Sequence, residues 1–448
     1  MAAPYSDPTA LSGFLKPVFG ELQWLLPNEC HLQKNVPFSK ADAVGKQFEE
    51  PLQVKTSWGV TFAGSAGDVM ALSAAVPSKT VPAEVKPFLT ILGDLVSYSM
   101  FDRGAEAGKK AFESTGRYVG KNLSIQLRRI LEMSMLCGQD GFMEIESYST
   151  GTVATGRIVV TAASLRSGVM AFLEGAKLDI QDAATTTMVA DGAAGAAVGI
   201  GVLAVNIDNR TIDFEAVPTL GASGTPIVPV AGQKLFLHGA NLSVSATANY
   251  MEMVGIQKQI SATTGTIFAI NKATYQAVRG NTVTSVGPIS AGVLTTGAAK
   301  AINRGFQGEM WAYVSPLTWG ELNARNIAQR VFDSSYKKGG TEVGSDAIKI
   351  SGNGVTLDVR SHSMVSDSTY LLIPKDGPKR IGSAYENSTV EGAEEVSTDI
   401  SFMIPGTSER FVDPVQGYNA VKVECRSDQA IYLPKPAHCV YGTGITHT

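Results

Sequence analysis

The chain has 448 residues, of which 44% are hydrophobic and 17% charged, and its formal net charge is −4. This length suits two or three domains, and the charge carries no overall basic signature of a nucleic-acid reader. The first ten residues lack the basic and apolar regions of a secretory signal, and the most apolar run, 192–205, is short for spanning a bilayer.

Residues 1–50 carry five prolines, which interrupt any regular element, yet large apolar residues such as Phe14, Phe19 and Trp24 recur among them. A disordered tail would not contain these side chains. Two interpretations remain open, a lid on the chain's own core and an arm that packs on a neighbouring subunit.

Residues 52–62 (LQVKTSWGVTF) alternate strictly, so Leu52, Trp58 and Phe62 share one face of a predicted strand. A second extended run, 83–91, contains Pro87, which is typical of an edge strand. The residues between them, 63–82, are rich in Gly, Ala, Ser and Pro. We therefore predict a hairpin with a long tip, and long loops in compact proteins are usually functional.

A long helix is predicted from about Gly104 to Cys137, because apolar residues recur there at steps of three and four. These residues are Val119, Leu123, Leu127, Ile130, Leu131 and Met135. Gly138 follows directly, and we expect it to end the helix in the left-handed conformation.

The rest of the chain alternates between short strands and helices. The segment 186–247 has the texture of a small β insertion, which we expect to be a separate module on an outer face. Helices are expected at 162–175, 270–278, 290–304 and 316–332, and strands at 354–362, 370–376 and 419–436.

Signals for chemistry are weak. The run GIGVLA (199–204) resembles a dinucleotide-binding loop, but strand and turn residues follow it where a helix should open. The pairs Cys30–His31 and His438–Cys439 lack the spacing of metal ligands, and we interpret His362 as a satisfied surface histidine. Four irregularly spaced cysteines suggest free thiols in a reducing compartment. We expect no enzyme, no cofactor and no metal.

The order of arm, hairpin, long helix and mixed α/β segments resembles the major capsid proteins of tailed double-stranded DNA phages. The resemblance is carried by 93–141, whose ending RILEMSMLCGQDG is similar to the end of that family's spine helix. The segments 265–281, 301–305 and 316–330 resemble its axial domain, and 208–240 resembles a small inserted β domain of one branch.

The resemblance implies an α+β, HK-ninety-seven-like capsid fold of six parts. They are an N-terminal arm (1–50), an extended β-hairpin loop (51–91), a spine helix with the peripheral domain (92–179), a β insertion (180–246), an axial domain (247–353) and a return to the peripheral sheet (354–448).

It also implies a function in assembly. The chain would form pentamers and hexamers of an icosahedral head shell that encloses double-stranded DNA without reading its sequence, in a virion assembled in the host cytoplasm. Implied partners are a separate scaffolding protein, a portal protein and possible decoration proteins, with no membrane. The alternatives are an encapsulin-like compartment and, more remotely, a β-rich surface or fibre protein, which would be expected to carry a secretory signal or repeats.

Inter-subunit contacts are predicted for the large apolar residues of the hairpin and the arm: Trp58, Phe62, Val69, Met70, Leu72, Phe14, Phe19 and Trp24. Lysines in or near the loop at Lys55, Lys79 and Lys86 could in principle form cross-links, but lysines in loops are common and we do not expect it.

Overall fold

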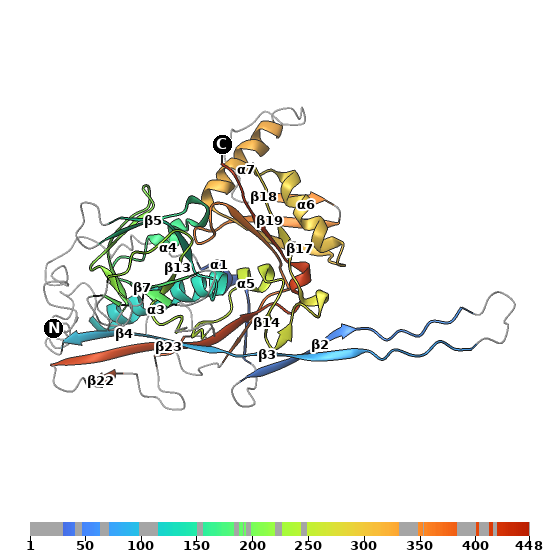
Figure 1. Ribbon diagram of the computed structural model, residues 1–448, viewed down its shortest axis with the longest axis horizontal. Coiled ribbons are helices and arrows are strands. Elements are labelled where there is room, and N and C mark those ends of the chain that lie inside the picture. The colour runs from blue at the N-terminus through green and yellow to red at the C-terminus, as the bar shows by residue number, and fades with distance from the viewer. Residues whose placement is uncertain are drawn as a thin grey trace.

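The structure is a computed structural model. It describes residues 30–40, 47–62, 71–97, 115–149, 156–182, 188–190, 192–193, 199–219, 226–242, 249–330, 348–352, 354–382, 400–402, 412–414 and 419–447. Figure 1 shows a body of packed sheets and helices, from which a two-stranded ribbon projects far to one side.

The long strand β23 (Ala420–Tyr432) organises the base of the body. It pairs antiparallel with β4 (Phe88–Ser97), from Ala420 opposite Ser97 to Gln429 opposite Phe88. The same sheet also contains β1 (Phe38–Lys40), β21 (Lys379–Gly382) and β22 (Val412–Pro414).

The helix α3 (Thr115–Cys137) packs against β4 and β23. Its predicted apolar stripe is confirmed at five of six residues, since Val119, Leu123, Leu127, Leu131 and Met135 are buried in the largest core cluster, whereas Ile130 is half-buried. That cluster also contains Val96 of β4 and Cys425 of β23, so the helix and the long sheet share one core. The first part of the predicted helix lies outside the described residues.

The end of α3 differs from the expectation. The left-handed residue is Gln139 (φ 62°), and Gly138 is absent from the positive-φ residues. A Cβ on Gly138 would lie 2.3 Å from the Met253 carbonyl oxygen, and one on Gly255 would lie 2.4 Å from the Gly138 nitrogen. Glycine is needed here because two backbones cross in contact, joined by the hydrogen bond from Gly255 N to Gly138 O (2.9 Å).

A second sheet closes on itself, since β10 pairs with both β11 and β7 in the order β10-β11-β6-β5-β13-β7-β10, with β8 paired outside the ring. Its strands are β5 (Met143–Ser149), β6 (Arg157–Val160), β7 (Lys177–Gln181), β8 (Met188–Ala190), β10 (Ile200–Asn206), β11 (Thr211–Phe214) and β13 (Lys234–Leu237). The short strands β9 (Gly192–Ala193) and β12 (Pro218–Thr219) pair beside it.

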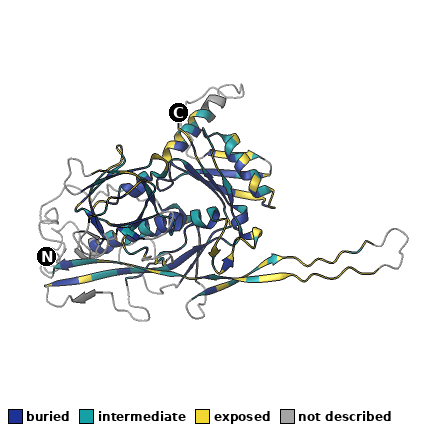
Figure 2. Ribbon diagram, in the orientation of Figure 1, coloured by how far each residue is buried: buried dark blue, intermediate teal, exposed yellow. Residues whose placement is uncertain are grey.

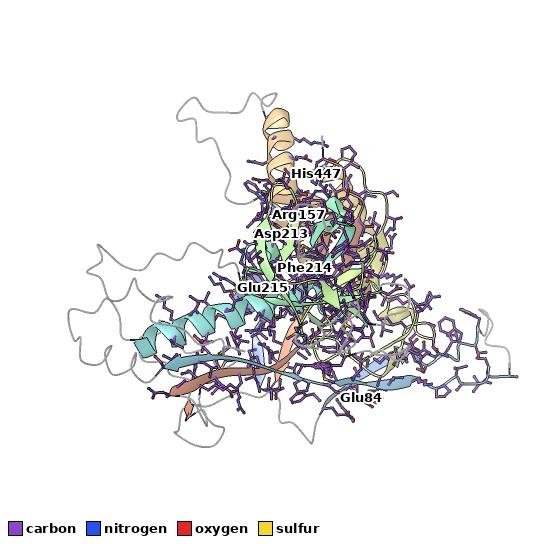
Figure 3. All side chains as sticks on the ribbon, turned by 60° about the vertical axis from the view of Figure 1, so that its left-hand side comes forward. Glu84, Arg157, Asp213, Phe214, Glu215 and His447 are labelled. Carbon is purple, nitrogen blue, oxygen red and sulfur yellow. The ribbon has the colours of Figure 1, made fainter. Side chains whose placement is uncertain are left out.

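The prediction that 180–246 forms a separate β module is therefore wrong, because these residues share a sheet with strands that precede them. Closing the ring requires β5 and β6, which precede residue 180, and β7 lies across that limit. The ring's buried residues, such as Ile158, Leu178 and Phe214, belong to the same core cluster as α3. Arg157 and Asp213 face each other across β6 and β11, with Nη2 2.9 Å from Oδ2 (Figure 3).

A third sheet forms the upper part of the body, in the order β16-β24-β20-β17-β19-β18. Its strands are β16 (Asn281–Val283), β17 (Gly308–Val314), β18 (Ile348–Gly352), β19 (Val355–Ser361), β20 (Thr369–Pro374) and β24 (Val440–Thr443). The helices α6 (Ala291–Ile302) and α7 (Pro316–Arg330) add Leu294 and Leu322 to its separate core cluster. Both helices were expected, and α6 begins where the Ser290 hydroxyl accepts from Val293 N.

Two other expected helices are wrong. Instead of a helix at 162–175, the chain has η3 (Ala162–Ser164) and α4 (Ser167–Met170), because Gly168 N donates to Ser363 O rather than within a helix. At 270–278 lies β15 (Ile270–Asn271), paired with β14 (Thr266–Ile267), and then η5 (Gln276–Val278). Buried Ile270 and Val278 join a third core cluster there, so tertiary packing overrides helix propensity.

The remaining helical elements are α1 (His31–Asn35), α5 (Ile256–Ser261) and η6 (Pro436–His438). The predicted strand 83–91 is in fact two strands. The chain breaks at Lys86–Pro87 into β3 (Lys79–Val85) and β4, which pair with different partners.

Candidate functional site: the projecting hairpin

The projecting ribbon is the hairpin of β2 (Phe48–Lys55) and β3, whose paired strands we call the hairpin root. The root rests on the third core cluster, where Phe48, Ala83 and Val85 pack with Tyr432 of β23 and Ile270. Leu52 and Val81 lie partly buried at its outer limit. Midway along the root, Pro51 lies directly opposite Pro82.

Beyond Lys55 and Lys79 the chain leaves the body, and we call the described residues 56–62 and 71–78 the projecting segment. Its two sides stay together through a few bonds. Trp58 N donates to Val76 O (2.9 Å) and Val76 N to Trp58 O (2.6 Å), and Ser73 N donates to Thr61 Oγ1 (2.8 Å). Figure 2 shows this ribbon almost uniformly exposed, in contrast to the body.

Large apolar side chains lie bare on the projecting segment. Trp58 is 70% exposed, and Phe62 and Leu72 are each 86% exposed. The whole stretch 56–78 contains one charged residue, Asp68, although charged residues make up 17% of the chain. A surface of this kind is typical of a contact that excludes water rather than one that pairs charges.

The sequence-predicted contact residues divide into two groups. Trp58, Phe62 and Leu72 lie together on the projecting segment and are exposed there. Val69, Met70, Phe14, Phe19 and Trp24 lie outside the described residues. Val60 and Val76, which are 51% and 52% exposed, extend the same apolar surface. Seen from another side, the ribbon again leaves the body near Glu84 (Figure 3).

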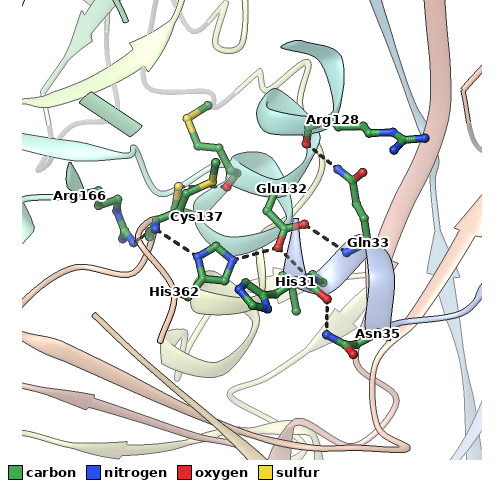
Figure 4. Close-up of polar contacts among 11 residues, drawn as sticks. His31, Gln33, Asn35, Arg128, Glu132, Cys137, Arg166 and His362 are labelled. Atoms are coloured by element: carbon green, nitrogen blue, oxygen red, sulfur yellow. Dashed lines mark hydrogen bonds and ion pairs between the residues drawn. The ribbon is translucent and has the colours of Figure 1, made fainter. Parts of the chain in front are cut away.

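Inside the body, a buried polar contact joins three distant parts of the chain (Figure 4). Glu132 of α3 accepts from Leu32 N (2.7 Å) and Gln33 N (3.1 Å) of α1, and lies 3.0 Å from His362 Nε2. His362 Nδ1 accepts from Met364 N, so Nε2 carries the proton that is donated to Glu132. Both side chains are fully buried, so the expectation of a surface His362 is wrong.

The other residues that were considered for metal, nucleotide or thiol chemistry do not come together in one site in the described structure. Among the described residues, no three histidine, cysteine, aspartate or glutamate side chains are grouped to hold a metal. The glycine run at 199–204 falls mostly on strand β10. All four cysteines are buried thiols, and burial raises the pKa of Cys137 to about 12. No helix in the described part of the chain is long and apolar enough to cross a membrane.

No protein-family model matches the chain, and no curated protein matches it in sequence. Solved structures do match it over nearly full length. The cyanophage A-1(L) capsid is 10% identical with a TM-score of 0.46, covering 96% of this chain and 97% of that chain. The capsid of a native GTA particle is 7% identical with a TM-score of 0.46, covering 99% and 100%.

An encapsulin complex, holo-SrpI from Synechococcus elongatus, is 6% identical with a TM-score of 0.44, covering 98% of this chain and 97% of that chain. All three matches cover nearly the whole chain at 10% identity or less, with similar TM-scores for the phage, GTA and encapsulin structures.

Proposed function

We propose that the chain is a shell subunit whose projecting hairpin binds a neighbouring copy. The observation that carries this is the bare apolar surface of Trp58, Phe62 and Leu72. These residues belong to the ribbon that projects from the body in Figure 1. Burying such a side chain stabilises a complex by about 1.5–3 kcal/mol. A subunit that exposes three such side chains therefore gains free energy when a second molecule covers them.

A contact between a projection and a different surface of the next copy is heterologous, and heterologous contacts generate rings when the rotation closes. Rings of five and six that join into a closed shell use this one contact many times over, which multiplies its effect. The proposed role is therefore structural, with no catalytic step.

Within this role, the function we favour is the icosahedral head shell of a phage that encloses double-stranded DNA, assembled with a scaffolding and a portal protein. An encapsulin-like compartment that holds a protein cargo is the second candidate, since its subunit would need the same reach. The two differ in content, because a head shell protects DNA from nuclease and a compartment protects a protein.

The first test is electron microscopy and sedimentation of the purified full chain, alone and with a co-expressed scaffold. We expect pentamer- or hexamer-like rings or closed icosahedral particles. A chain that stays monomeric at high concentration, with and without scaffold, would contradict the proposal. Nuclease treatment of particles from the natural source then separates the two candidates by what survives inside.

A further inference from the structure

A cavity of about 410 Å³ with a mixed polar and apolar wall lies where the closed β ring, the end of α3 and the upper sheet meet. Its wall includes Arg166, Lys234 and Gln257, with Tyr441 and Thr443 of β24. The volume falls within the range of small-molecule sites in proteins. Hydroxyl side chains from three separate segments face it, among them Ser164, Ser261 and Ser368.

Arg166 is the unusual member of this wall, because its side chain is buried at 5% exposure. It donates three hydrogen bonds, from Nε to Phe142 O (2.7 Å), from Nη1 to Met364 O (2.8 Å) and from Nη2 to Gln257 Oε1 (2.7 Å). All three acceptors are neutral, and among the described residues no carboxylate lies within 4.0 Å of the guanidinium. A buried positive charge without a counter-ion is costly.

The acids of the cavity wall do not supply that counter-ion. Asp140 is held by Lys234 Nζ (2.7 Å) and by Gln257 Nε2 (3.1 Å). Glu144 is the other acid of the wall, and its carboxylate makes no ion pair with Arg166 in the described structure. Arg166 is thus linked to a wall carboxylate indirectly, through the amide of Gln257 to Asp140.

Three side chains of the cavity wall keep N–H or O–H donors beyond the bonds they already make. A guanidinium has five N–H groups, so two of Arg166 remain beyond its three bonds. Tyr441 Oη accepts from Gln257 Nε2 (2.8 Å), which leaves its own O–H to donate. Burial raises the pKa of Tyr441 to about 12, so this proton is present at neutral pH. Lys234 retains protons beyond the one directed at Asp140.

We propose that this cavity binds a small oxyanion, with Arg166 and Tyr441 as its principal donors and Lys234 at its side. An oxyanion accepts several hydrogen bonds and donates few or none, which suits the spare donors of these three side chains beside a buried cation that makes no direct ion pair with a described carboxylate. Bound there, it ties the closed β ring to β24 of the upper sheet. The inference does not depend on shell assembly.

The test is calorimetry of the full chain with inorganic phosphate, and separately with acetate. Arg166 is left unchanged, because it also holds the loops at Phe142 and Met364. Tyr441→Phe removes one hydroxyl and little volume. We expect saturable binding of one phosphate per chain to the unaltered protein, and at least tenfold weaker binding to Y441F.

Tyr370→Phe is the matched control, because Tyr370 is a fully buried tyrosine of β20 that does not line the cavity. Y370F should bind phosphate like the unaltered chain. Acetate binding as tight as phosphate would point to a carboxylate, as an acidic side chain of a second copy would present, and preference for phosphate would point to a free oxyanion. Lack of saturable binding of either anion, or equal binding by Y441F, would overturn the proposal.

Discussion

The hairpin root and the projecting segment belong to one ribbon, but they differ in how far their apolar side chains are exposed to solvent. In the root, Phe48 is 8% exposed because Tyr432 and Ile270 cover it. In the projecting segment, Phe62 is 86% exposed on the same kind of extended chain. The root is stabilised by the subunit's own core, whereas the large apolar side chains of the projecting segment are left in solvent in the described structure.

The strongest test of this division removes the projecting segment. Replacing 56–78 by a short Gly–Ser turn keeps β2 and β3, so thermal unfolding and circular dichroism should stay near those of the unaltered chain. Closed particles should disappear in sedimentation, because no subunit reaches the next. A Gly–Ser replacement of equal length is the control that retains reach but lacks apolar side chains, and it should fail as well. Normal particle yield from either variant would refute the role of the segment.

A matched pair of phenylalanines tests the same contrast by free energy. Phe48→Ala should lower the free energy of unfolding by about 3–5 kcal/mol, because it leaves a cavity in a packed cluster. Phe62→Ala should change it by less than about 0.5 kcal/mol, since nothing in the described subunit packs on that ring. For particle yield we expect a clear loss with Phe62→Ala. Denaturant unfolding measures the free energy of unfolding, and sedimentation measures particle yield. Equal loss of unfolding free energy in both variants would contradict the difference between the root and the projecting segment.

A buried lysine that follows β15 lies beside the root. Lys272 is 3% exposed beside Leu52 and Tyr432, and burial lowers its pKa to about 8. The folded chain loses this proton near pH 8, whereas the unfolded chain holds it up to about pH 10.5. The free energy of unfolding should therefore rise by roughly 1–3 kcal/mol between pH 8 and 10.5.

Lys272→Met should remove this rise, as measured by urea unfolding at several pH values. The exposed Lys349 of β18 provides the control, because Lys349→Met should leave the rise intact. A rise that persists in Lys272→Met would show that the lysine is not its source.

The smallest expected effect concerns the few bonds that hold the projecting segment together. Thr61→Val keeps the shape of the side chain but removes the oxygen that accepts from Ser73 N. We expect the Ser73 amide to exchange with solvent about tenfold faster, without a change in global stability. Thr56→Val, in the same segment, should leave that amide unchanged. Unaltered exchange in Thr61→Val would mean that the Trp58–Val76 bridge and the bond from Ser73 Oγ to Val60 O (2.9 Å) suffice to keep the two sides paired.

The sequence predicts elements best where periodicity and packing agree. The stripe of α3 and the helices α6 and α7 were expected from their residues, because each buries one apolar face on a neighbouring sheet. The sequence also predicts the hairpin. Apolar and polar residues alternate in the sequence as far as Phe62, whereas more and less buried residues alternate in the structure only within β2. Beyond Lys55 there is no body to pack on, and a pattern of residues cannot show where the body ends.

Contacts between distant residues could not be predicted. Glu132 and His362 are 230 positions apart, and nothing near His362 marks it as a buried partner of a helix. The closed β ring was missed for a similar reason, since β5 and β6 resemble ordinary connecting strands until β13 and β11 pair with them. The uncompensated Arg166 is also visible only once the loops around it are in place.

The facing prolines of the root, Pro51 and Pro82, disfavour the pairing of a foreign strand with the edges of the ribbon. In an antiparallel ladder, two residues that cannot donate to each other occupy a pair whose amide positions point outward, away from the partner strand. On the β3 side, nearer the body, Glu84 N donates outward to Phe268 O (3.0 Å). Each edge therefore has a gap in its row of donors at the same level. A strand from another molecule could not zip along either edge without losing a bond there. If the hairpin binds a neighbouring copy as proposed, this gap disfavours edge-to-edge pairing into open fibres and leaves the contact to the apolar side chains of the projecting segment.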